Sequence, residues 1–390
     1  MIVTALAFFA TAQNSQPDFA KEWQEIRRSI SRSYYARKTR EAEMNRILDE
    51  FGVSIGGSRS PAEFESNVNR MIDAFHDSHF SYLTKSDQGW YLMDSLAKRD
   101  TAESMPNIGA WFRKTPSGYA VQMLLDGLSA MASDLRKGDV IEQIEGRPFT
   151  PVESLRPFVG QEVSLTLRRG VETLSRKIRV NSPRVLPMFL EASTNSVKII
   201  EDHGRRIGYF HLWTMANDDF RSALSNAIYG KLKNTDGFIL DLRDGFGGRP
   251  EGYADPLFRP EVELDWITSD NKTEQLFGYG RPMVTIINEG SRSAKEVLSY
   301  ILKKGHRCTF VGSRTAGNVL GTFPERLSNG SYIEIPIADV FTDGSRLEGK
   351  GVSPDISVPQ EFDSSGKDLD LNSALGHLKN IPTFHRFDQA

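Results

Sequence analysis

The segment 283–317 constrains the fold more than any other part of the chain. It begins with a short apolar run, passes through a polar turn, and then places apolar residues at helical spacing: Ala294, Val297, Leu298, Ile301 and Leu302. This pattern predicts a buried strand, a tight turn and a helix that starts at Ser293 and buries one face. Free N–H groups and the helix dipole at such a start stabilise a developing oxyanion, which suits a nucleophile. Because Ser293 and Glu296 also fit an S-x-x-E capping box, simple helix capping is the alternative.

Composition excludes several classes of partner. The 390 residues predict two or three domains, and a net charge of -3 gives no bulk attraction to nucleic acid or anionic membranes. No apolar segment reaches the roughly 20 residues that a membrane-spanning helix needs. The single cysteine, Cys308, excludes an internal disulfide framework and a cysteine-rich zinc site. We therefore expect no nucleic-acid partner, no stable membrane span, no cofactor and no metal.

Residues 1–16 are interpreted as a short export signal. An apolar run ends at the small residues Ala10 and Ala12, as at a signal-peptide cleavage site, although the basic residues that usually precede such a run are missing. The signal would make the protein periplasmic or secreted. If the leader is not functional, the protein is cytoplasmic.

Residues 17–100 are predicted to form a helical region. Pro61 can begin a helix, and apolar residues at 3.6-residue spacing lead from there to the segment His76-Asp77-Ser78-His79. A His-x-x-His pair can bind metal, but without a further cysteine or carboxylate pattern it is weak evidence for a metal site. Capping of the helix end is the structural explanation for His79.

Residues 104–183 carry short alternating strands separated by turns, which predicts a compact β-rich domain. Within it, residues 133–148 resemble the LxxGDxIxxINGxP core of a PDZ domain, and a plain β-sandwich is the alternative. The resemblance implies that a loop with Ile108, Gly109 and Ala110 holds the C-terminal carboxylate of a bound peptide on its N–H groups.

Residues 195–383 alternate strands and helices, which predicts an α/β layered core with a mostly parallel sheet. We expect strands at 207–212, 237–242, 283–287 and 309–312, and helices at 218–232 and 293–304. The glycine-rich turn 244–248 follows one of these strands. Its N–H groups can bind an anion, and a plain tight turn is the alternative.

Four motifs resemble, in the same order, those of the C-terminal processing peptidases and the related tricorn-type peptidases. They are DLRDGFGG at 241–248, GSRSAKE at 290–296, GSRTAG at 312–317 and EGKGVSPDI at 348–356. The resemblance implies an α/β core of the ClpP/crotonase-like type, preceded by a helical N-terminal region and a PDZ-like domain. It also implies that Ser293 is the nucleophile of a serine peptidase.

One departure from the family pattern decides the expected mechanism. In the processing peptidases, a lysine about two dozen residues after the serine is the general base. This chain has Asn318 at that position, and an amide cannot accept the proton. The tricorn-type branch uses a Ser-His pair and a late glutamate instead, which resemble Ser78, His79 and Glu348 of this chain.

The resulting hypothesis is a serine endopeptidase that binds polypeptides, including their C-termini. The catalytic residues that the resemblance implies are Ser293, His79, Ser78 and Glu348, with an oxyanion hole from the N–H groups of Gly247 or Gly248 and of Ala294. Two alternatives stay open. One is a catalytically inactive scaffold that binds peptides through the PDZ-like domain, and the other is an acyl hydrolase or carrier of apolar small molecules.

Overall fold

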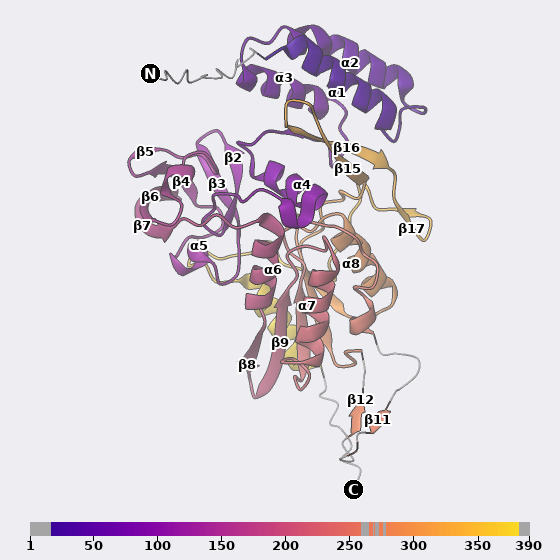
Figure 1. Ribbon diagram of the computed structural model, residues 1–390. Coiled ribbons are helices and arrows are strands. Elements are labelled where there is room, and N and C mark those ends of the chain that lie inside the picture. Colours follow the sequence, from indigo (N-terminus) through magenta and orange to yellow (C-terminus); the bar gives the residue numbers. More distant parts are fainter. Residues whose placement is uncertain (1–16, 259–264, 268, 270–272, 276–277, 382–390) are drawn as a thin grey trace, which may run out of the picture.

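The computed structural model describes residues 17–258, 265–267, 269, 273–275 and 278–381. Figure 1 shows a group of helices at one end, a β-rich unit at the side and a central sheet flanked by helices. The export signal predicted at residues 1–16 lies outside the described residues. None of the described helices is long and apolar enough to cross a membrane.

The central sheet has six strands. They are β8 (Lys198–Asp202), β9 (Arg205–His211), β10 (Gly237–Asp241), β13 (Met283–Ile287), β14 (Thr309–Gly312) and β19 (Ile356–Ser357), in the spatial order β19-β14-β13-β10-β9-β8. Neighbouring strands are parallel, except that β8 is antiparallel to β9. Every residue of β10 and β13 is buried, as is typical of inner strands of a parallel sheet. The predicted α/β core is thereby confirmed, and its ClpP/crotonase-like assignment stays a prediction.

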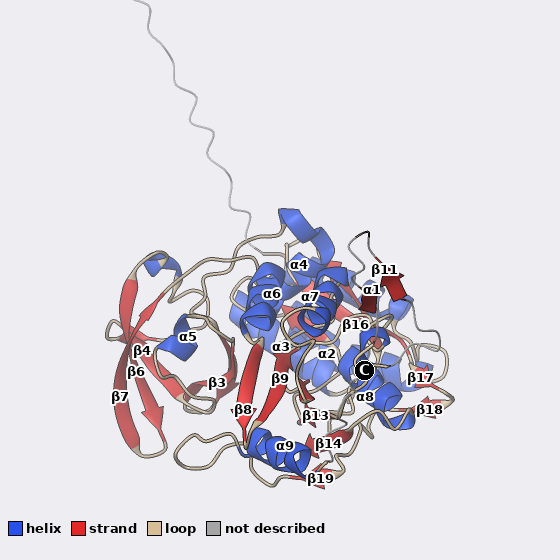
Figure 2. Ribbon diagram, turned by 90° about the horizontal axis from the view of Figure 1, so that it is seen from below, coloured by secondary structure: helices blue, strands red, loops and turns tan. Residues whose placement is uncertain are grey.

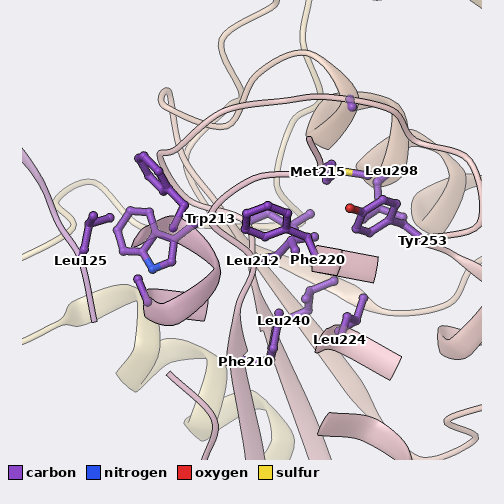
Figure 3. Close-up of a cluster of buried hydrophobic side chains, with 14 of the residues drawn as sticks. Leu125, Phe210, Leu212, Trp213, Met215, Phe220, Leu224, Leu240, Tyr253 and Leu298 are labelled. Atoms are coloured by element: carbon purple, nitrogen blue, oxygen red, sulfur yellow. The ribbon is translucent and has the colours of Figure 1, made fainter. Parts of the chain in front are cut away.

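Helices cover both faces of this sheet, as Figure 2 shows. They are α6 (Val185–Asn195), α7 (Asp218–Tyr229) and α8 (Ala294–Lys304) on one face, and α9 (Leu369–Asn380) on the other. In Figure 3, Phe210 and Leu240 of the sheet lie near Leu224 of α7. Their neighbours Tyr209 and Ile239 belong to the apolar cluster under α9, because successive side chains of a strand point to opposite faces.

The sequence pattern does not predict helix α6. Its residues fall in the gap between the two domains expected at 104–183 and 195–383, and Pro187 argues against a helix there. The proline lies in the first turn of α6, where a missing N–H group breaks no intrahelical hydrogen bond.

The N-terminal helices pack on a hairpin from the distant C-terminal half of the chain. The helices are α1 (Phe19–Ser33), α2 (Glu41–Gly56) and α3 (Pro61–Asp73), and the hairpin is β15 (Gly321–Arg326) with β16 (Tyr332–Ala338), to which β1 (Ser81–Leu83) adds a strand. Trp23 and Ile30 share one apolar cluster with Ile333 and Ile335 of β16. The helical region is as predicted, whereas the hairpin is not predicted. This contact carries the segment that follows α3 to the central sheet.

Residues 110–179 form an antiparallel sheet with its own apolar core. Its elements are β2 (Ala110–Thr115), β3 (Gly118–Leu124), α5 (Ser129–Ala132), β4 (Val140–Ile144), β5 (Arg147–Pro148), β6 (Glu162–Arg169) and β7 (Glu172–Arg179). The spatial order is β2-β3-β4-β6-β7, so β2 is an edge strand. Leu125, just after β3, lies beside Trp213 of the central core (Figure 3). The predicted strands are present, and the PDZ assignment stays a prediction.

The other described elements are short apart from one helix. They are α4 (Gln88–Lys98), η1 (Arg99–Thr101), η2 (Arg156–Phe158), η3 (Asp255–Leu257), β11 (Asp265–Ile267), β12 (Thr273–Gln275), β17 (Phe341–Thr342) and β18 (Ser345–Arg346).

Candidate active site

The candidate site begins with two loops that follow neighbouring strands. Strands β10 and β13 pair in parallel with Asp241 opposite Ile286, so the loops after them leave the sheet at the same edge. Side chains of the second loop then bind the first. Asn288 accepts the N–H of Asp244 at 3.0 Å, and the Ser291 hydroxyl donates to the Leu242 carbonyl at 2.8 Å. The glycine-rich turn and the predicted nucleophile segment are therefore fixed against each other.

Ser293 occupies the N-cap position of α8, as the capping alternative expects. The Glu296 carboxylate accepts the Ser293 N–H at 3.2 Å. The backbone of Ser293, however, has φ 59° and ψ −128°, whereas an ordinary N-cap residue has an extended backbone. A positive φ is costly for a residue other than glycine, and such strain clusters at active sites. Capping alone therefore does not account for the conformation of this serine.

Glu296 connects the nucleophile segment to the GSRTAG motif. Its buried carboxylate accepts the hydroxyl of Thr315 at 2.6 Å and the N–H groups of Gly317 and Asn318 at 2.7 and 2.9 Å. The Asn318 carbonyl in turn accepts the N–H of Ser293 at 2.8 Å. The sequence pattern indicates only a capping role for Glu296. The spacing of residues within the two motifs is the only sequence signal for this role of Glu296. That the two motifs contact each other is visible only in the folded chain.

The structure brings Ser78, His79 and Glu348 together from opposite ends of the chain. The Ser78 hydroxyl lies 3.0 Å from His79 Nδ1 and donates to Glu348 Oε2 at 3.0 Å. The same carboxylate accepts the N–H groups of Val319 and Leu320 at 2.5 and 3.2 Å. A continuous hydrogen-bonded relay therefore runs from Glu348 to the imidazole, and it leaves Nε2 of His79 available for a proton transfer.

The expected helix-capping role of His79 is wrong, because α3 ends at Asp73. His79 lies beyond the helix with φ 53°. Asp77 anchors this segment by accepting the Tyr35 hydroxyl at 3.0 Å and the Arg40 guanidinium at 2.9 Å. The segment is thus held by side chains, which fixes the position of the imidazole.

His79 and Ser293 open into the same cleft, which has a volume of about 1670 Å³. Among the described residues, no hydrogen bond joins the Ser293 hydroxyl to His79, and such contacts are often long before substrate binds. Asn318, at the position of the absent lysine, also lines the cleft. Within the same described part of the chain, no group of three or more histidine, cysteine or acidic side chains could hold a metal ion.

Gly247 packs directly against the nucleophile. A Cβ atom on this residue would touch Ser293 Cβ and would lie 2.6 Å from its hydroxyl oxygen and 2.9 Å from the Ala294 nitrogen. In the described part of the chain, the N–H groups of Gly247, Gly248 and Ala294 donate no hydrogen bond. These three N–H groups are therefore available to an acceptor from outside the described chain, and of the two glycines Gly247 is the one with an observed contact to Ser293.

Two lysines hold the glycine-rich turn in place. The buried ammonium of Lys295 donates to the Asp244 carbonyl at 2.7 Å, and Lys137 from the β-rich unit pairs with the Asp244 carboxylate at 2.6 Å. Burial lowers the pKa of Lys295 to about 7. The sequence motifs assign a role to neither lysine. For Lys295 the signal was a charged residue at a helix position that faces the core.

The loop expected to bind a peptide carboxylate already has internal partners. Asn107 Oδ1 accepts the N–H groups of Gly109 and Ala110 at 2.6 and 3.2 Å. On the outer edge of β2, the side chain of Gln88 donates to the Ala110 carbonyl at 3.0 Å and accepts the Phe112 N–H at 2.9 Å. Ile108, like Ala110, is fully buried. The expected open carboxylate-binding loop is therefore not found in this state, because side chains occupy its donors.

Comparison with known proteins decides the family. Residues 206–358, which contain all four motifs, match the model of peptidase family S41. The chain carries a peptidase family S41 domain. The matched model is that of a family of peptidases.

Relatives of this S41 domain extend the similarity over more of the chain. The carboxyl-terminal-processing peptidase 2, chloroplastic, of Arabidopsis thaliana is 26% identical over 272 residues, or 63% of this chain and 51% of that protein. The carboxyl-terminal-processing protease of Synechocystis sp. is 28% identical over 338 residues, or 82% of this chain and 78% of that protein. The chain therefore spans only about half the length of the first relative and more of the second.

A solved structure shares the fold of this S41 chain. The photosystem II D1 C-terminal processing protease aligns with a TM-score of 0.55 at 21% identity, and the alignment covers 93% of this chain and 98% of that one. At this identity the match shows a common fold. The shared fold includes regions on both sides of residues 206–358.

The pH dependence of Ser293 reactivity should report the burial of His79. Burial, with a smaller contribution from the charge of Arg292, lowers the pKa of His79 from 6.5 to about 4. A neutral imidazole is the proton acceptor, so a lowered pKa extends reactivity to lower pH. We expect the labelling rate of Ser293 by a fluorophosphonate probe to fall with a midpoint near pH 4.

Unfolding must be separated from this titration. The pKa of His79 is about 4 in the folded state and 6.5 in the unfolded state. The free energy of unfolding therefore decreases as the pH falls from 6.5 to about 4. Circular dichroism at each pH would show whether the protein is still folded. A midpoint near the ordinary histidine value of 6.5 in folded protein would contradict the burial effect.

Replacing Gly247 by alanine should disable the site without unfolding the chain. The added methyl group would press on Ser293 and push the N–H of residue 247, which alanine keeps, out of position; an oxyanion donor lost in this way costs a factor of about 10² to 10³ in rate. We expect fluorophosphonate labelling of Gly247→Ala to fall at least about 100-fold. Gly376→Ala is the matched control, because a Cβ there meets nothing within 4 Å. Equal labelling of the two variants would contradict the placement of Gly247 at the nucleophile.

Proposed function

We propose that the chain is a serine endopeptidase in which Ser293 is activated by His79, Ser78 and Glu348. The observation that carries this proposal is the unbroken hydrogen-bonded relay from Glu348 through Ser78 to His79, in the cleft that also contains Ser293. A lysine base is not needed in this arrangement, so Asn318 is compatible with activity. The inactive-scaffold alternative offers no reason for an intact relay.

The proposed reaction follows acyl-transfer chemistry. The Ser293 oxygen attacks the scissile carbonyl while His79 takes the hydroxyl proton, and His79 then gives that proton to the leaving amine. Glu348 acts through Ser78, which orients the imidazole and offsets its transient positive charge. Water then attacks the acyl-enzyme, with His79 again as the base, and releases Ser293.

The oxyanion of each tetrahedral intermediate would be bound by the N–H groups of Ala294 and of Gly247 or Gly248. These donors are fixed before the reaction, because Lys295 and Asn288 bind the turn that carries the glycines. Preorganised donors of this kind contribute about 3–4 kcal/mol each to the lowering of the activation barrier.

Polypeptides are the proposed substrates, and the β-rich unit is proposed to present them as a PDZ-like domain. The cleft extends from Ser293 to Trp111 and Phe112 on β2, so one extended chain can contact both. Addition of a strand to an open sheet edge is the usual way in which such domains bind peptides. A C-terminus would bind at Gly109 only after the Asn107 side chain has moved.

The proposed catalytic residues can be tested by active-site labelling. We expect a fluorophosphonate probe to label the wild-type protein, Ser293→Ala to show no labelling, and His79→Ala to label at least about 1000-fold more slowly. Glu348→Gln should retain part of the rate, because an amide still accepts the Ser78 hydroxyl but carries no charge. Wild-type labelling kinetics in His79→Ala would show that this histidine is not the base.

The presentation role predicts that Gln88 competes with peptide for the edge of β2. Gln88→Ala removes two hydrogen bonds to that edge, each of roughly 1 kcal/mol, so peptide affinity should rise about 30-fold. Fluorescence anisotropy with labelled random decapeptides would measure this in a Ser293→Ala background, which prevents cleavage. Gln143→Ala, at an exposed glutamine of β4, is the control. An unchanged affinity in Gln88→Ala would refute binding at this edge.

A further inference from the structure

Arg292 is a cation in the active-site cleft that the proposed mechanism does not use. It directly precedes Ser293 in the chain, and both residues line the cleft. Its guanidinium carbon lies 4.7 Å from the centre of the Phe246 ring, and Phe246 directly precedes Gly247. Arg292 is thus held between the nucleophile segment and the glycine-rich turn.

This guanidinium has no anionic partner in the described part of the chain. It forms no ion pair and donates no hydrogen bond there, although an arginine side chain offers five donors. Burial lowers the pKa of Arg292, and this effect exceeds the opposing influence of Glu334 and Asp244. A half-buried cation without a partner is an unfavourable state that a bound anion would relieve.

The nearest acidic groups already have other partners. Asp244 pairs with Lys137 at 2.6 Å. Glu334, which also lines the cleft, accepts the Ser81 and Thr322 hydroxyls at 3.1 and 3.0 Å. Burial raises the pKa of Glu334, which favours the neutral form of its carboxyl group. In the described part of the chain, neither carboxylate forms an ion pair with the Arg292 guanidinium.

We propose that Arg292 selects substrates that carry a carboxylate close to the scissile bond. This inference rests on the proposed peptidase function, because it assigns the role of Arg292 relative to the substrate held at Ser293. The chemistry of the site is recognition of a planar carboxylate by a guanidinium, which can form two parallel charged hydrogen bonds. An acidic side chain and the C-terminal carboxylate of a short substrate offer the same group.

The position of Arg292 next to Ser293 in the chain indicates where the carboxylate of a bound substrate would lie. Arg292 flanks Ser293 on one side, and Phe246, which holds the guanidinium, flanks the proposed oxyanion donor Gly247. A substrate carbonyl placed at Ser293 therefore has its nearest residues within reach of the guanidinium. Residues farther along the substrate would reach the walls of the cleft formed by α4 and β2 instead.

The test uses matched peptides and a binding measurement that does not depend on turnover. Two labelled peptide libraries differ only in that one has aspartate wherever the other has asparagine, and each is made with free and with amidated C-termini. We expect the Ser293→Ala protein to bind the carboxylate-bearing member of a pair about 10- to 100-fold more tightly, the effect of a charged hydrogen bond. The Arg292→Gln change in the same background should abolish this preference.

A matched arginine controls for general electrostatic attraction. Arg249 lines the same cleft but is exposed, so Arg249→Gln should keep the preference. Equal binding of carboxylate and amide peptides, or an unchanged preference in Arg292→Gln, would overturn the inference. If aspartate peptides bind more tightly than asparagine peptides, Arg292 binds the side-chain carboxylate. If peptides with a free C-terminus bind more tightly than amidated ones, Arg292 binds the terminal carboxylate.

Cleavage by the wild-type protein separates this inference from the proposed function. If no library is cleaved and Ser293 is not labelled by the fluorophosphonate, the peptidase proposal fails, whereas the binding result still decides the role of Arg292. If peptides are cleaved without regard to carboxylates, the peptidase proposal stands and the inference fails. The circular dichroism spectrum of Arg292→Gln should match that of the wild-type protein, which shows that the variant is folded.

Discussion

The carboxylate of Glu348 is the contact on which the candidate site depends. It binds the hydroxyl of Ser78, which lies 270 residues earlier in the chain, and the N–H groups of Val319 and Leu320. The N-terminal helices, the loop after β14 and the last motif are thereby joined at one point. Because an anion with several donors is well stabilised even when buried, this contact can orient His79 without a metal or a second charge.

The motifs that resemble the processing peptidases are coupled by hydrogen bonds in the folded chain. Glu296 of the second motif binds Thr315 and Gly317 of the third, and the Thr315 hydroxyl accepts the Val352 N–H of the fourth at 2.7 Å. In the first motif, Asp241 pairs with Arg243 at 2.6 Å in a buried site. Buried polar groups need such partners, and these contacts supply them.

The unusual features of the site lie at positions between these coupled residues. Arg292 and Lys295 flank the two residues that carry the nucleophile and an oxyanion donor, and Asn318 replaces a base. Lys295 donates to the Asp244 carbonyl of the first motif, whereas the side chains of Arg292 and Asn318 make none of the described bonds between the motifs. The scaffold can therefore stay constant while the charge of the cleft and the identity of the base change, since each depends on side chains outside the coupled set.

Much of the central fold follows from local pattern. The strands at 283–287 and 309–312 have the predicted bounds, because apolar runs between turn residues are a strong local signal. Helix α6 and the hairpin of β15 and β16 do not follow from it. The first has a proline in its opening turn, and the second is stabilised by packing on helices some 300 residues away, which no local window contains.

By itself, the sequence determined which chemical groups are available: a serine at a strand-to-helix junction, no lysine at position 318, and a histidine and a glutamate of the type that the tricorn-type branch uses. Only the tertiary structure decided that Ser78 links His79 to Glu348, that Asn107 and Gln88 occupy the donors of the peptide loop, and that Arg292 has no ion-pair partner among the described residues. The physical reason is that hydrogen bonding and desolvation depend on distances between residues far apart in the chain, which folding alone fixes.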